Sequence, residues 1–322
     1  MNQKNIFSAR MAQSVTCCTE VLGIALLILV ALAVAGCSKQ QSNSYYDDGV
    51  QALKAGQHKE ALDFFTLAIQ SNPRNAAAYL ASGLCSLKLG DYEKALRDFQ
   101  TTTTLSPGST DARRGSGEAH LGLEQWEEAV KDFDAVLAVD PDDLNTLNNR
   151  GYARSHSGLI QEALDDFNAC IEKDPKCALY LHNRGSLYRR LDQLDSALAD
   201  YDSAIALSPD DPTLYLSRGS TYYERGRWDD AMRDFNTAIE KNPSSSTGYK
   251  YRGMCLKSQG NWKDAVADFS RAIELDPFDA ELYYERGAAA LQAGDQQMYD
   301  ADMAKFDEMT KHDATEHDAT EK

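Results

Sequence analysis

The sequence predicts an all-α fold, a solenoid of helical hairpins, from three regularities along its 322 residues. A glycine returns eight times, and an alanine and a proline seven times each, always at steps of 34 residues. Apolar and aromatic residues recur between them at helical spacing, as at Ala197, Tyr201, Ala204 and Ile205. The proline closes the unit, because it lacks an N–H group and clashes with the preceding helical turn. Each 34-residue unit is therefore expected to be one pair of helices.

An apolar segment precedes the repeats. Residues 21–36 carry no charged side chain, follow Lys4 and Arg10, and end in small residues before Cys37. This run is short for a membrane span, which needs about 17–25 residues, and is typical of a secretory signal. The order Leu32-Ala33-Val34-Ala35-Gly36-Cys37 resembles a bacterial lipobox, in which the cysteine is lipidated after cleavage.

The lipobox resemblance implies a signal peptide at residues 1–36 and a lipidated N-terminus with a short spacer at residues 37–41. It also implies a palmitate-bearing lipoprotein of the bacterial cell envelope, on the outer membrane and facing the periplasm. An uncleaved N-terminal transmembrane anchor is the alternative, because Glu20 directly precedes the apolar run and the leader is long. Either anchor would hold the repeats close to a membrane.

Eight consecutive units fill residues 42–313. Their predicted bounds are 42–75, 76–109, 110–143, 144–177, 178–211, 212–245, 246–279 and 280–313. The last unit is degenerate, since Tyr299, Met303 and Phe306 stand where the others carry alanine, an aromatic residue and a small residue. We expect this hairpin to form the polar cap that terminal repeats need. Residues 314–322 repeat a short polar sequence and are expected to be a disordered tail.

The order of residues within a unit identifies a family. The sixth unit reads Tyr215, Arg218-Gly219, Tyr222, Trp228, Ala231, Phe235, Ala238 and Pro243. This order resembles the tetratricopeptide repeat (TPR), and the resemblance implies a right-handed superhelix of about eight helix-turn-helix repeats. It implies protein binding in general but no particular partner.

Arginine and aspartate recur in the later units at a separation of 16 residues. The five predicted pairs are Arg150 with Asp166, Arg184 with Asp200, Arg218 with Asp234, Arg252 with Asp268, and Arg286 with Asp302. A hairpin that turns at its fifteenth residue brings these positions to the same height on facing helices. We therefore expect ion pairs within each repeat rather than a row of charges for a ligand.

The family resemblance also implies which side chains line a concave groove, through positions 2, 5, 6, 9, 12 and 13 of each repeat. At the N-terminal end these positions are apolar, as at Leu53, Leu84 and Leu87. In the middle they are polar and basic, and we expect them to bind an extended peptide, with amides for its backbone and cations for its carboxylates. The predicted groove residues are Asn148, Asn149, Tyr152, His156, His182, Asn183, Arg189, Arg190, Lys250 and Lys257. A solvated inner face without a fixed ligand is the alternative.

Composition limits the other functions. The net charge of −17 disfavours nucleic-acid binding, because an acidic surface repels phosphates. No phosphate-binding loop, nucleophile motif or metal-ligand spacing is present in the sequence, so no enzyme activity, cofactor or metal is expected. The predicted function is a membrane-tethered scaffold for other proteins of the cell envelope. The alternative is an accessory subunit that regulates an envelope enzyme such as a cell-wall hydrolase.

Overall fold

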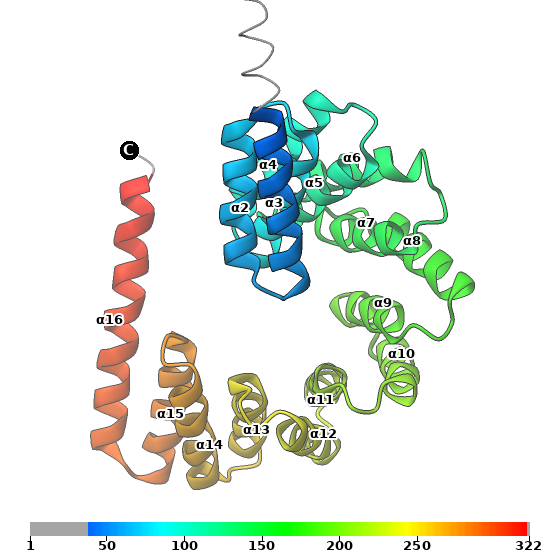
Figure 1. Cartoon of the computed structure of the whole chain (residues 1–322). Coiled ribbons are helices and arrows are strands. Elements are labelled where there is room, and N and C mark those ends of the chain that lie inside the picture. Colours follow the sequence, from blue (N-terminus) through cyan, green and yellow to red (C-terminus); the bar gives the residue numbers. More distant parts are fainter. Residues whose placement is uncertain (1–37, 321–322) are drawn as a thin grey trace, which may run out of the picture. The chain divides into compact units, whose positions relative to one another are not determined.

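The computed structural model describes residues 38–320, and every regular element in that range is an α-helix (Figure 1). The helices alternate with short turns, as the repeat period predicts. The chain divides between Gly158 and Leu159 into two compact units. The superhelical path of the whole array involves both units and stays a prediction.

The first unit contains seven helices within its described residues. A helix through residues 38–54 is followed by α2 (His58–Ser71), α3 (Ala76–Leu89), α4 (Tyr92–Leu105), α5 (Thr110–Gly122), α6 (Trp126–Leu137) and α7 (Leu144–His156). Each helix from α2 to α7 packs against the next one along the chain.

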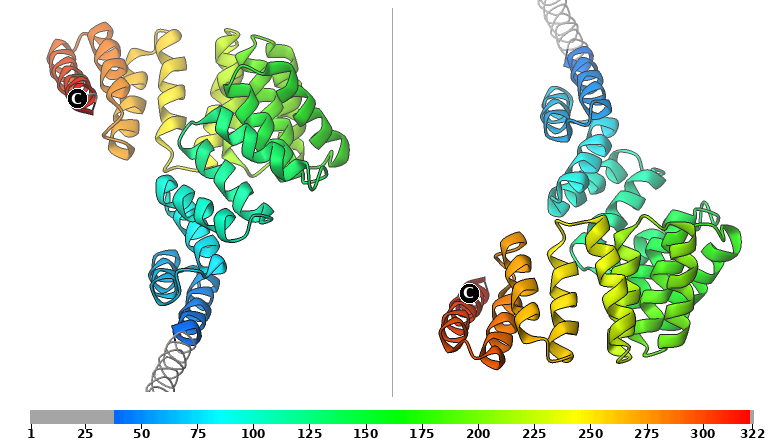
Figure 2. Two further views of the ribbon diagram at one scale, coloured as in Figure 1. Left: turned by 90° about the horizontal axis from the view of Figure 1, so that it is seen from above. Right: turned by 90° about the horizontal axis from the view of Figure 1, so that it is seen from below.

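The second unit continues the same alternation. Its helices are α8 (Ile160–Lys173), α9 (Ala178–Arg190), α10 (Leu194–Leu207), α11 (Pro212–Glu224), α12 (Trp228–Lys241), α13 (Ser246–Ser258), α14 (Trp262–Leu275), α15 (Ala280–Ala293) and α16 (Gln296–Thr320). Consecutive helices contact each other throughout, so the hairpins from α9 to α16 lie side by side in chain order, from green to red in Figure 2.

The repeated glycine lets the two helices of a hairpin come close together. A methyl group added at Gly219 would lie 2.7 Å from the ring of Phe235, and one at Gly83 would lie 2.7 Å from the ring of Phe99. Such distances are shorter than any real contact, so a side chain here would force the helices apart. The repeated alanines are fully buried, as at Ala231. The repeated glycine and alanine therefore mark the close contact between the two helices of a hairpin.

Four arginines of the second unit form what we call the arginine ladder, which consists of Arg184, Arg218, Arg252 and Arg286. Each binds the aspartate 16 residues later with two nitrogens. In Arg218, Nε and Nη2 donate to the carboxylate of Asp234 over 2.8 and 2.7 Å. Four of the five predicted pairs are thus confirmed, whereas Arg150 and Asp166 lie on different units.

The ladder also links neighbouring repeats. Each arginine donates with Nη1 to the side chain 16 residues earlier, on the second helix of the preceding repeat, as from Arg218 to Asp202 over 2.7 Å. The equivalent acceptors are Asn168, Asn236 and Ser270. One guanidinium therefore connects three helices, and its aspartate partner is buried in every case.

The last helix extends beyond the predicted repeat. α16 continues to Thr320, so residues 314–320 are helical where the polar composition predicts a disordered tail. The physical reason is that no glycine or proline interrupts the chain after Gly294, while alanine, glutamate, lysine and methionine favour helix. Across residues 38–320, no helix is both long and apolar enough to cross a bilayer. Cys37 and the apolar run before it lie outside the described residues.

Candidate functional site

The predicted groove residues lie on both units, with four on α7 and six on α9 and α13. Each unit is therefore described by itself. On α7, Asn148 is buried and Asn149 is half-buried, while Tyr152 and His156 are exposed. Trp126, from the start of α6, completes an aromatic cluster with these two rings. The centroid of its ring lies 4.5 Å from that of His156 and 6.1 Å from that of Tyr152.

The predicted basic residues of the second unit are mostly paired within the chain. Arg189 Nη1 lies 3.0 Å from Glu224 Oε1. Lys250 Nζ lies 2.8 Å from Asp279 Oδ2 and 2.6 Å from Glu281 Oε2. Lys257 pairs in the same way with Glu285 on α15. Glu224, Glu281 and Glu285 belong to the following repeat, whereas Asp279 is the last residue of the repeat that contains Lys250. Acidic side chains of this chain thus neutralise most of the basic residues on α9 and α13. The sequence did not reveal these pairs, because the partners lie about 30 residues apart.

Histidine 182 is also held by the following repeat. Its Nε2 lies 2.9 Å from Ser217 Oγ, and the ring lies 5.8 Å from that of Tyr201. Burial lowers the pKa of His182 despite its hydrogen bond with Asn183 and the nearby Asp211 carboxylate. The imidazole is therefore neutral at pH 7, and it is not a cation for a ligand.

The first unit contains an apolar cavity of about 440 Å³, which we call the leucine cavity. Its lining residues come from α3, from the ends of the helices on either side, and from α5. They are Leu53, His58, Leu84, Leu87, Lys88, Tyr92 and Glu118. Leu84 remains 43% exposed, so its side chain is available to a ligand at the mouth of an apolar space.

Two polar side chains at this cavity, His58 and Glu118, lose hydration without full compensation from hydrogen bonds or ion pairs. His58 Nδ1 is buried and has no hydrogen-bond partner among the described residues. Burial raises the pKa of Glu118, although Lys88 and Arg114 attract its charged form. An unpaired buried nitrogen and a partly desolvated carboxylate are both groups that an incoming ligand could satisfy.

Sequence reasoning identified the leucines of this cavity as groove residues but assigned the peptide site to the basic stretch. The available signal was the recurrence of Leu53 and Leu87 at the same groove position of adjacent repeats, with Leu84 at another groove position shortly before Leu87. The burial of Glu118 and the unpaired nitrogen of His58 had no signal in the sequence, because both depend on contacts between repeats. Among the described residues, no group of three His, Cys, Asp or Glu side chains could hold a metal ion.

The comparisons with known proteins agree with this architecture. Models of the tetratricopeptide repeat match residues 52–97, 86–147, 117–184 and 184–254, and a TPR repeat model matches residues 255–294. A search of curated protein sequences found no match.

Solved structures share the fold at low sequence identity. A tetratricopeptide repeat protein from Parabacteroides merdae is 18% identical with a TM-score of 0.67, and the match covers 78% of this chain and 99% of that one. A chain of the APC/C hetero-tetramer Cut9–Hcn1 is 14% identical with a TM-score of 0.61, covering 79% of this chain and 50% of that one. MamA from Desulfovibrio magneticus RS-1 is 21% identical with a TM-score of 0.50, covering 52% and 96%. With its 34-residue helical hairpins and these matches along residues 52–294, the chain belongs to the tetratricopeptide repeat family.

Proposed function

We propose that this protein is an interaction scaffold that binds an extended segment of a partner protein through the leucine cavity. The TPR fold is a protein-binding fold, and the leucine cavity presents an exposed apolar side chain at a groove position. Leu84 carries the proposal, because it is exposed, lines the cavity and lies at a groove position. An apolar anchor from the partner would fill the space, and Glu118 and His58 could bind its backbone N–H and polar groups.

The electrostatics favour an amphipathic partner over a purely acidic one. Arg189, Lys250 and Lys257 already pair with carboxylates of this chain, so an acidic ligand would have to displace those partners. Asn149 and Arg190 remain candidate contacts of the predicted groove, since both lie at the surface of their helices. We therefore assign most of the binding free energy to apolar burial, at about 25 cal/mol per Å² of apolar surface removed from water.

We further propose that the scaffold is anchored by lipid at Cys37 and faces the periplasm from the outer membrane. The support is the lipobox-like order of residues 32–37 at the end of an uncharged apolar run. A transmembrane N-terminal anchor is the competing arrangement. In function, the competing class is an accessory subunit that changes the activity of an envelope enzyme.

The experiment compares two substitutions on one helix. Leu84→Asp places a charge in the cavity, whereas Leu89→Asp is the matched control, because Leu89 is 46% exposed on α3 and does not line the cavity. Partners are cross-linked in intact cells and quantified by mass spectrometry. We expect Leu84→Asp to lower the recovery of specific partners about 10-fold or more, as hot-spot losses of 2 kcal/mol or greater predict.

Circular dichroism is used to check that both variants are folded before their partner recovery is compared. Undiminished partner recovery with folded Leu84→Asp protein would exclude the leucine cavity as the binding site. The purified partner then separates scaffold from regulatory subunit. A scaffold leaves the catalytic rate of an enzyme partner unchanged, whereas an accessory subunit alters it.

A further inference from the structure

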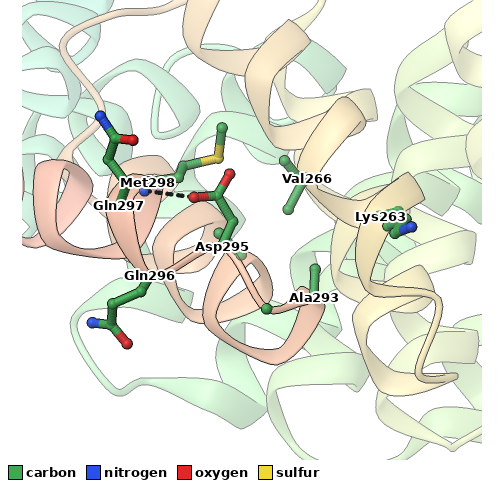
Figure 3. Close-up of a pocket in the computed structure, with 9 residues that line it drawn as sticks. Lys263, Val266, Ala293, Asp295, Gln296, Gln297 and Met298 are labelled. Carbon is green, nitrogen blue, oxygen red and sulfur yellow. Dashed lines mark hydrogen bonds between the residues drawn. The ribbon is translucent and has the colours of Figure 1, made fainter.

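A second cavity lies between the last two repeats, away from every groove position. It has a volume of about 590 Å³ and is enclosed by α14, the end of α15 and the start of α16. Val266 lies on one side, and Asp295 and Met298 lie on the other (Figure 3). Ala290 and Ala293 form part of its wall. We call this space the C-terminal cavity.

Two alanines leave this space empty. Within the second unit, the residues that precede Ala290 at steps of 34 are Tyr188, Tyr222 and Leu256, all of them much larger than alanine. Tyr222 and Leu256 both pack against the apolar core of their own region. At the last junction the same position presents only a methyl group, so the volume of a large side chain is missing.

The polar side of the junction is altered as well. Arg225 and Gln259 occupy the position equivalent to Ala293, and they donate to Asp195 and Asp229 of the preceding repeat, in the second case over 3.1 Å. At the last junction Lys263 replaces the aspartate, and Ala293 provides no donor. Lys263 is exposed, and its ammonium group has no ion-pair partner within the described part of the chain. Asp295 also lines the cavity, but its carboxylate accepts the backbone N–H of Met298 at the start of α16, so Lys263 is the cation of this site without an acceptor in the preceding pattern.

We propose that the C-terminal cavity binds an aromatic side chain of a partner protein, and that a carboxylate next to that side chain pairs with Lys263. The aromatic group would occupy the position that the ring of Tyr222 occupies two repeats earlier. The carboxylate would pair with Lys263, which stands where the two preceding repeats carry an aspartate. The volume lies within the range of about 300–1,000 Å³ that is usual for ligand sites. The site is separate from the leucine cavity and does not depend on it.

The test uses a minimal probe of this chemistry. N-Acetyl-L-tyrosine carries the ring and the carboxylate, whereas N-acetyl-L-tyrosinamide carries the ring alone. Both are titrated into the full chain labelled with ¹³C at its methyl groups. We expect saturable shifts of the methyl signals of Val266, Ala290 and Met298. The acid should bind up to about fivefold more tightly than the amide, as an exposed ion pair allows, and Lys263→Ala should abolish that difference.

Ala290→Tyr supplies the missing ring from the chain itself and should abolish the shifts. Ala293→Gln supplies a smaller blocking group and gives the same test if the tyrosine variant fails to fold. Absence of any shift in the wild-type protein, or shifts that persist in a folded blocked variant, would overturn the proposal. Leu84→Asp should leave the shifts unchanged, so failure at one cavity is distinguishable from failure at the other.

Two further measurements test whether the cavity is instead occupied by a second copy of this chain or by its own N-terminal segment. Sedimentation of the wild-type chain and of Ala290→Tyr should show the same oligomeric state. A wild-type dimer that Ala290→Tyr converts to a monomer would assign the cavity to a second copy and overturn the proposal. A synthetic peptide of residues 21–36 that displaces N-acetyl-L-tyrosine would overturn it in favour of this chain's own N-terminal segment.

Discussion

The turn between the two helices of a repeat requires one residue in the left-handed region. Six repeats use glycine there, with φ between +73° and +89°. The other two use Glu124 at φ 56° and Asp192 at φ 58°. A side chain in this region meets its own backbone, and glutamate lacks the short polar group that makes aspartate more tolerant. The strain at these turns is thus local and removable.

We expect Glu124→Gly to raise the free energy of unfolding by about 0.5–1 kcal/mol, and Asp192→Gly to raise it less. Urea denaturation followed by circular dichroism measures both effects. Gln193→Ala is the control, because Gln193 makes no capping hydrogen bond and its replacement should change stability by less than about 0.5 kcal/mol. A loss of stability in both glycine variants would contradict this account.

At this scale the sequence predicted packing better than exposure. The repeated glycine and alanine indicated where the two helices of one hairpin touch, and the structure places Gly219 there against the ring of Phe235. The availability of Leu84 and the empty volume beside Ala290 were not predictable. Both depend on how far neighbouring repeats separate, and a one-dimensional period contains no such distance.

Among the elements, the arginine ladder is the strongest polar feature of the hairpins. Asp234 is only 4% exposed, yet its carboxylate receives two hydrogen bonds from Arg218. Hydrogen bonding to Asp234 raises the pKa of Arg218, so the guanidinium remains charged at any ordinary pH. A buried carboxylate of this kind depends on its partner.

Arg218→Leu should therefore destabilise the protein by about 3–5 kcal/mol, because it leaves Asp234 buried without a counter-charge. The double substitution Arg218→Leu with Asp234→Leu should recover much of that loss, since both charges are removed. Thermal unfolding of the two single variants and the double variant gives the coupling energy. A cost below about 1 kcal/mol for Arg218→Leu would place the pair with ordinary surface ion pairs.

The predictability of the elements differs along the chain. The helices and the ladder followed from a strict period, because every hairpin repeats the same local interactions. The end of α16 did not follow, since composition indicated a solvated tail and the helix continues to Thr320 without a breaking residue. The hydrogen bond from Arg218 to Asp202 of the preceding repeat was not predicted either, because the geometry of a single hairpin does not fix the distance to its neighbour.

For the whole molecule, we propose that location depends on lipidation of Cys37. If this cysteine is lipidated, several acyl chains would make release from the membrane slow, at about 0.8 kcal/mol for each buried CH₂ group. We expect Cys37→Ala to abolish incorporation of an alkyne-labelled fatty acid and to change the membrane fraction in which the protein is found. An intact segment of residues 1–36 on the wild-type protein, detected by mass spectrometry, would contradict the proposal.

The sequence gives the net charge of the protein directly, but it does not show which charged side chains pair with one another in the folded chain. A net charge of −17 indicated an acidic protein, and the basic residues of α9 and α13 suggested a local exception. In the folded chain Arg189, Lys250 and Lys257 have acidic partners from the next repeat. These ion pairs could not be predicted from the sequence, because the paired residues lie about one repeat apart and meet only when neighbouring hairpins stack.

The arginine ladder also gives the second unit a direction. Each ladder arginine takes its bidentate partner from its own repeat and its further acceptor from the repeat before it. A truncation that removes repeats from the C-terminal end leaves every remaining guanidinium with all its acceptors. A truncation from the other end strips the new first arginine of one of them. Duplication or loss of repeats during evolution would accordingly break fewer bonds of the arginine ladder at the C-terminal side of the array.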